Sequence, residues 1–303
     1  MAILLGFEDN RAEKPSKKNI EQVVKMGIRE TINKEIKKRT GIDVKNKKDN
    51  ISELKKINED NLINILKILE EEVKSKSFKE SSQRGKLRGF VPLKDNTIDK
   101  YSNRNKLEVP LVRLIGLLKN WTTELNLLSG YNNSSKSGGK FSIDLAKKHK
   151  NVLKLAEVKE WKGADTLIFA VIEIITNFMI YLIMREKEKD KDDRWAPKCN
   201  KFQIEVIAPA EYYDCQGIDS YKKRSKEIEK NLLKVLQLSK DYNVEHLKFK
   251  FSEVFIKDDK NGLIKIMKDR NDLLTNKYLK GKPSKISRKE LAEDFGLKIQ
   301  DRK

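Results

Sequence analysis

Apolar and polar residues alternate with clear periods along this chain, and the periods divide it into helices and strands. Apolar residues recur every three or four positions from Lys17 to about Lys38 and from Ser52 to about Lys76. This spacing predicts two amphipathic helices. A third helix is predicted from Leu107 to about Leu128, with Pro110 in its first turn. With this helix in place, no strand is predicted before Phe141.

The middle of the chain has a strand pattern followed by a long apolar run. Alternation from Phe141 to Ala146 and a β-favouring run from Val152 to Trp161 predict a hairpin whose turn is Lys147 to Asn151. Leu167 to Met184 approaches the length of a membrane span, but Glu173 would be costly in hydrocarbon. We therefore interpret this run as a buried helix that crosses over to a parallel strand.

Two further strands separated by a helix complete the pattern. Phe202–Ala208 is predicted to run parallel to the second hairpin strand, Ser220–Lys240 is an amphipathic helix, and Val244–Ile256 is a strand. The fold class is therefore α/β, with a mixed sheet flanked by helices. We expect three parts: a helical N-terminal module with a basic linker (1–100), an α/β core (101–257) and a basic helical C-terminal extension (258–303).

The composition of the 303 residues points to a polyanionic partner. Lys and Arg number 66 against 46 Asp and Glu, a net charge of +20. Such an excess favours nucleic acid first and an anionic membrane surface second, although a general lysine bias also contributes. The two cysteines suggest no disulfide framework, and the N-terminus lacks the basic start of a secretory signal. We expect a cytoplasmic protein that does not use a membrane.

Three residues of the hairpin form a pattern suited to phosphodiester chemistry. Glu157 and Lys159 lie two positions apart on one strand, so they project from the same face, about 7 Å apart. If the hairpin closes near His149, Asp144 lies across the ladder from the region of Leu155 and Glu157. Two carboxylates are suitable ligands for Mg²⁺, which can polarise a phosphate and acidify a bound water. Lys159 could orient that water or offset charge developing on phosphorus.

Ile143-Asp144, followed 13 positions after the acid by Glu157-Val158-Lys159, resembles the PD-(D/E)XK nuclease superfamily; Ile143 stands where the motif has proline. The resemblance implies that Asp144 and Glu157 bind Mg²⁺, with Mn²⁺ as a substitute, and that Lys159 is the catalytic lysine. It implies a restriction-endonuclease-like core and a metal-dependent endonuclease that hydrolyses DNA. Type II restriction enzymes, related defence or mobile-element nucleases and homodimers are the corresponding expectations.

Several other residues are candidates for supporting roles. In this family the helix before the hairpin often carries an additional acid near the metal, and Glu108 and Glu124 are available. Helix capping or surface exposure is the alternative for each of them. Basic residues in polar segments could contact nucleic acid or simply belong to solvated linkers. These candidates are Arg84, Lys86, Arg88, Lys136, Lys140 and Arg194.

Alternatives to the nuclease hypothesis follow from the same residues. The acids and the lysine could form a solvent-exposed cross-strand ion pair. The chain could be a non-catalytic nucleic-acid-binding protein on a nuclease-like fold, with salt-steep binding and no divalent-dependent product. It could also be a structural assembly protein built on its helices. RNA is an alternative substrate to DNA, because the motif does not sense the 2′-hydroxyl.

Overall fold

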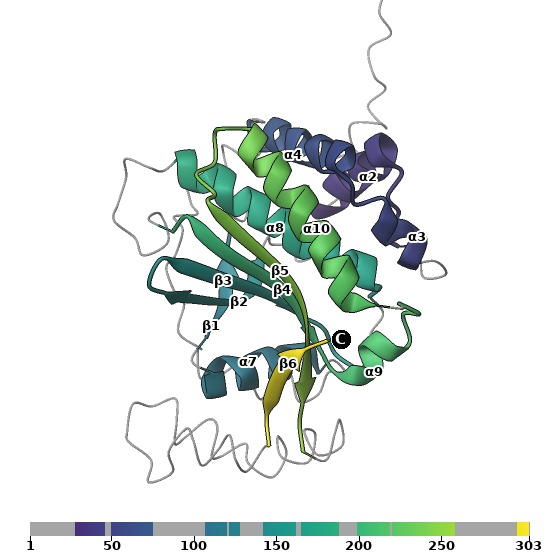
Figure 1. Cartoon of the computed structure of the whole chain (residues 1–303), viewed down its shortest axis with the longest axis vertical. Coiled ribbons are helices and arrows are strands. Elements are labelled where there is room, and N and C mark those ends of the chain that lie inside the picture. Colours follow the sequence, from purple (N-terminus) through teal and green to yellow (C-terminus); the bar gives the residue numbers. More distant parts are fainter. Residues whose placement is uncertain are drawn as a thin grey trace, which may run out of the picture.

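One mixed β-sheet with helices on both faces organises the computed structural model in Figure 1. The structure describes residues 28–45, 50–74, 107–119, 121–127, 142–161, 165–187, 199–218, 220–257 and 296–302. Within these ranges the sheet has 6 strands, and their order across the sheet follows the chain. They are β1 (Thr122–Asn126), β2 (Ser142–His149), β3 (Val152–Val158), β4 (Lys201–Ala208), β5 (His246–Phe255) and β6 (Lys298–Asp301). The predicted α/β class with a mixed sheet is confirmed.

The strands change direction in the middle of the sheet. β1, β2 and β3 pair antiparallel, β4 and β5 each pair parallel to the strand before, and β6 returns antiparallel to β5. Parallel neighbours need a crossover connection, usually a helix. α8 (Leu167–Lys187) joins β3 to β4, while α9 (Ala210–Asp214) and α10 (Tyr221–Leu238) join β4 to β5. The predicted crossover helix and the parallel strand after it are confirmed.

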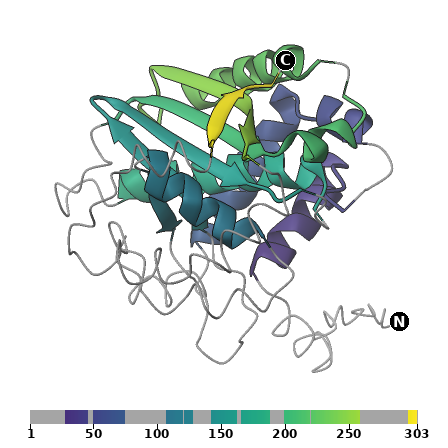
Figure 2. The ribbon, with the colours of Figure 1, turned by 90° about the horizontal axis from the view of Figure 1, so that it is seen from below.

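Two apolar clusters lie on the two faces of the sheet. One joins a sheet face to α8, α10 and three N-terminal helices, namely α2 (Ile28–Thr40), α3 (Asn50–Lys55) and α4 (Glu59–Lys74). The other lies between the opposite face and α7 (Glu108–Lys119). Figures 1 and 2 show α7 on one side of the sheet and the larger group of helices on the other. The N-terminal helices therefore share a continuous core with the sheet.

The composition of α8 follows from its position between these layers. In the described part of the chain it is the one helix that is long and apolar enough to cross a membrane, with a mean hydropathy of 2.3 in its most apolar 18-residue window. Inside the protein, however, 94% of its most apolar window is buried. A helix that is apolar all round is expected in such an enclosed position.

The helix predicted from Leu107 to about Leu128 is wrong in its second half. α7 ends at Lys119, and Thr122–Asn126 forms β1, which pairs antiparallel with β2. β-branched Thr122 and Thr123 favour an extended chain, and pairing with the hairpin overrides the helical spacing of the apolar residues. The sheet therefore has an opening strand before Asp144, which the sequence did not predict.

Two other boundaries differ from expectation. The helix predicted from Ser52 is two helices, because the Asn58 side chain accepts a hydrogen bond from the Asn61 N–H and begins α4 anew. The C-terminal extension is not helical throughout, since its last described residues form β6 along the edge of β5. Residues 258–295 of that extension lie outside the described residues, as do residues 17–27 of the first predicted helix.

Candidate active site

The β2–β3 hairpin brings the predicted acids together. The β2–β3 pairing ends at Leu145 and Ala156, and Asp144 and Glu157 are the next residues beyond it on the two strands. The Val158 N–H donates a hydrogen bond of 2.9 Å to Asp144 Oδ2, which ties the first acid to the second strand. This arrangement agrees with the register expected for a hairpin that closes just after His149.

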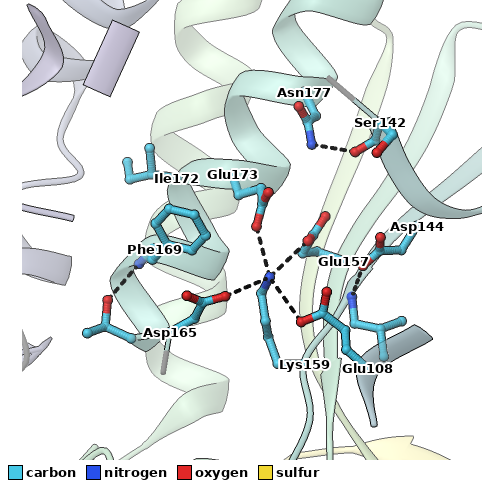
Figure 3. A network of polar contacts seen from close by, with 12 residues as sticks. Glu108, Ser142, Asp144, Glu157, Lys159, Asp165, Phe169, Ile172, Glu173 and Asn177 are labelled. Carbon is cyan, nitrogen blue, oxygen red and sulfur yellow. Dashed lines mark hydrogen bonds and ion pairs between the residues drawn. The ribbon is translucent and has the colours of Figure 1, made fainter. Parts of the chain in front are cut away.

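Lys159 lies at the point where β3 leaves the sheet. Its N–H still donates to Ile207 O at 2.9 Å, which extends the parallel pairing with β4 by one residue and fixes the direction of the side chain. The Lys159 Nζ atom is 3.0 Å from Glu157 Oε1 and 2.8 Å from Glu173 Oε2. Glu108 and Asp165 approach the same nitrogen at 3.9 and 3.6 Å. Figure 3 shows four carboxylates pointing at this one ammonium.

Burial distinguishes this cluster from a surface ion pair. Glu157 and Lys159 are each only 3% exposed, and Glu173 is 8% exposed. The alternative of a solvent-exposed cross-strand pair is therefore wrong for these residues. Charges held this far from water require partners, so their mutual contacts determine how the pocket behaves.

Sequence reasoning missed two acids and one cation of this pocket. Glu173, on α8, was considered only as a residue that would be costly in a membrane, and Asp165 was not among the candidates. Arg29, on α2, forms an ion pair with Glu173 Oε1. One signal could have identified Glu173: an acid within an otherwise buried helix needs a cation in the tertiary structure.

Negative charge exceeds positive charge in the pocket, and the pKa values respond to the excess. Burial raises the pKa of Asp144 to about 6, although Lys159 and the Val158 N–H oppose the shift. Burial, together with the charge of Asp144, raises the pKa of Glu157 well above its ordinary value. Burial likewise raises the pKa of Glu108 to about 7. These carboxyls would be easier to ionise if a further cation were present.

Glu173 and Lys159 behave in the opposite way and stay charged. Burial would raise the pKa of Glu173, but Lys159 and Arg29 lower it to about 2. Burial would lower the pKa of Lys159, but the carboxylates, led by Glu157 and Glu173, raise it well above its usual value. The pocket therefore combines one firmly held ion pair with acids that lack sufficient counter-charge.

The donor set fits a hard divalent cation. Glu157 Oε2 is buried and has no hydrogen-bond partner among the described residues. Asp144 lies across the ladder from it, so these two acids could supply two carboxylate ligands. Mg²⁺ is usually bound by one or two carboxylates together with water and substrate phosphate. In the described part of the chain, no three His, Cys, Asp or Glu residues form a metal-binding group, so any ion here would depend on that smaller set.

The remaining predicted residues are placed unevenly. Glu108 belongs to the pocket, at the N-terminus of α7. Glu124 lies in β1, between residues that pair with Leu145 and Ile143, so its backbone position is beside that of Asp144. Nothing is described of its side chain. The basic candidates Arg84, Lys86, Arg88, Lys136, Lys140 and Arg194 lie outside the described residues.

Comparisons with known proteins leave this geometry to be interpreted by itself. No family model matches the chain, and searches of curated proteins and of solved structures found no match.

Proposed function

We propose that this protein is a Mg²⁺-dependent endonuclease of the PD-(D/E)XK type that hydrolyses phosphodiester bonds in DNA. One observation carries the proposal: Asp144, Glu157 and Lys159 meet in a buried, acid-rich pocket in which Glu157 Oε2 has no partner among the described residues. A protein without a bound cation or substrate gains nothing from burying surplus carboxylates, which cost stability. Perturbed acids gathered in this way are typical of functional sites.

The order of elements around the pocket supports the same proposal. A helix, an opening strand, the acid-bearing hairpin, a crossover helix and a parallel strand follow one another as α7, β1, β2–β3, α8 and β4. This is the order that the motif resemblance implies for a restriction-endonuclease-like core. The strand that sequence reasoning did not find before Asp144 is β1, so the topology argues for the proposal more strongly than the motif alone.

The residues would divide the chemistry between them. Asp144 and Glu157 would hold the metal, which when bound supplies a Lewis acid for the phosphate and lowers the pKa of a coordinated water. Lys159, kept charged by its carboxylates, would orient the attacking oxygen and offset charge on the phosphoryl group. Glu108, with a pKa of about 7, could take up a proton near neutral pH.

Net charge supports nucleic acid as the substrate. The +20 excess would favour contacts with phosphates outside the acidic pocket. The pocket itself repels phosphates, because its carboxylates are negative. A divalent ion resolves this conflict, because it offsets the carboxylates where the scissile phosphate must approach.

The test is incubation of the purified chain with supercoiled plasmid, single-stranded DNA and RNA, each with Mg²⁺, Mn²⁺ or EDTA. We expect cleavage of DNA that requires a divalent ion and stops in EDTA. Salt-sensitive binding without any product would instead support the non-catalytic nucleic-acid-binding protein. Cleavage of RNA alone would retain the chemistry and change the substrate.

A further inference from the structure

A side chain of the N-terminal helices reaches the pocket. Arg29, in the first turn of α2, extends to α8 and forms an ion pair with Glu173 Oε1. A small cavity of about 10 Å³ lies between the two helices and is lined by Arg29, Phe169, Glu173 and their neighbours. A cavity of this size has room for about one water molecule. The Arg29 side chain, which is 28% exposed, therefore reaches α8 at the margin of this cavity.

Glu173 is shared between two cations through its two oxygens. Oε1 faces Arg29, and Oε2 accepts a hydrogen bond of 2.8 Å from Lys159 Nζ. With one oxygen fixed from α2, the carboxylate has one orientation toward Lys159. Lys159 in turn contacts Glu157 Oε1 at 3.0 Å. A chain of contacts thus runs from α2 to the predicted metal ligand.

Arg29 also changes the charge of the pocket. The acids Glu108, Asp144, Glu157, Asp165 and Glu173 surround Lys159, and Arg29 is a second cation, in contact with Glu173. Within the described ranges, removing it would leave Lys159 as the one cation in contact with these carboxylates. Such a pocket would attract a divalent ion more strongly, while Glu173 and Lys159 would be less firmly oriented.

We propose, on the basis of the proposed nuclease function, that Arg29 is a positioning residue. It acts through Glu173 to hold Lys159 beside Glu157. It also weakens the attraction of the pocket for a divalent cation. The N-terminal helices then complete the site, because α2 supplies this contact.

The test replaces Arg29 with Met, which keeps the length of the stem and removes the charge. By Coulomb's law at the dielectric of a partly buried site, we expect Mn²⁺ to bind about threefold to tenfold more tightly in titration calorimetry without substrate. We expect kcat for DNA cleavage to fall about tenfold or more, with little change in KM. A variant that had merely lost structure would bind Mn²⁺ more weakly, so opposite signs identify the positioning role.

Two further variants test whether the effect depends on the charge at position 29. Arg29→Lys restores the charge, and we expect Mn²⁺ affinity close to that of the unaltered protein and partial recovery of kcat. Arg39→Met is a matched control in the same helix, because Arg39 pairs with Glu71 of α4 at 2.8 Å. It removes an equal charge elsewhere and should change neither quantity.

A double-mutant cycle tests whether Arg29 acts through Glu173. In a Glu173→Gln background, Arg29→Met should lower kcat no further, since the residue through which it acts is already altered. Additive losses in kcat, or an unchanged Mn²⁺ affinity in Arg29→Met alone, would overturn the inference. Failure of the proposed function gives a different result, namely an unaltered protein that produces no divalent-dependent cleavage in any arm.

Discussion

The two ends of α8 each bury a charged residue, and they do so in different ways. Near the C-terminal end, Arg185 is 4% exposed and donates to Cys199 O at 2.7 Å and to Glu186 Oε1 at 3.0 Å. Its guanidinium also lies over the Phe202 ring, 5.5 Å from the centroid. Near the other end, Glu173 is drawn into a group of carboxylates around Lys159.

This difference separates a structural charge from a functional one. Around Arg185, one guanidinium meets backbone carbonyls, an aromatic face and one carboxylate, so charge and hydrogen bonds are balanced. Around Lys159, the acids outnumber the cations, and a buried oxygen of Glu157 has no partner among the described residues. Burial alone therefore does not mark a site. Imbalance does, because it persists only where a ligand restores the balance.

The sharpest test of this contrast removes one acid from the pocket. Asp144→Asn and Glu157→Gln should each lower the cleavage rate by about a thousandfold or more, or about 4 kcal/mol of transition-state stabilisation. Neither should destabilise the fold, because each removes a charge from a crowded group. Cleavage rates measured beside urea unfolding curves would reveal both effects.

Glu205→Gln is the matched control for those variants. Glu205 is buried, and it accepts a hydrogen bond of 2.7 Å from Ser252 Oγ. It pairs in register with Ala156, so its side chain leaves the sheet on the face opposite to that of Glu157. Cleavage should be unchanged in this variant. Equal losses in all three would mean that the pocket has no special role.

The second prediction concerns the balanced end of α8. Arg185→Met should lower the free energy of unfolding by about 3 kcal/mol, because the carbonyls of Cys199 and Asn243 lose a donor and the ion pair with Glu186 is lost. The cleavage rate at a temperature where the variant is folded should be unchanged. Denaturant titration measures the first quantity, and a large loss of activity in the folded variant would remove the distinction between the two ends.

The sequence was informative where the relevant interactions are local. The alternation in β2 and β3 and the apolar run of α8 each follow from neighbouring residues, so the hairpin, the crossover helix and the parallel strand β4 could be predicted. β1 could not, because its extended form depends on pairing with β2, and the apolar spacing before it matches a helix. β6 likewise exists because β5 offers it an edge.

The candidate site divides in the same manner. Asp144, Glu157 and Lys159 lie within one hairpin, so strand periodicity was enough to predict their meeting. Glu173 and Arg29 join from α8 and α2, at positions that only tertiary packing defines. An acid in so apolar a helix indicates a cation partner, but the sequence does not say which cation it is.

The third prediction concerns the pH dependence of stability, which should come from the acid-rich pocket around Lys159 and not from the surroundings of Arg185. The pKa of Asp144 is about 6 and that of Glu108 about 7 in the folded protein, against ordinary values of 3.8 and 4.5. The folded state therefore binds more protons than the unfolded state between about pH 4 and 7, and stability falls as pH rises through that window. Glu173, lowered to about 2, contributes stability that is lost only below this window. We expect unfolding to require about 2 kcal/mol more at about pH 5.5 than at about pH 8.

Substitutions and added Mg²⁺ test whether the acid-rich pocket causes this dependence of the free energy of unfolding on pH. Asp144→Asn should remove about 1 kcal/mol of the difference, whereas Arg185→Met should lower stability at both pH values and leave the difference intact. A divalent ion binds the deprotonated carboxylates, so Mg²⁺ should stabilise the protein more at the higher pH and flatten the slope. Thermal unfolding at both pH values, with Mg²⁺ or EDTA, measures all three effects. A slope unaffected by Asp144→Asn would mean that the proton uptake arises elsewhere, and the acid-rich pocket would then be as balanced as the surroundings of Arg185.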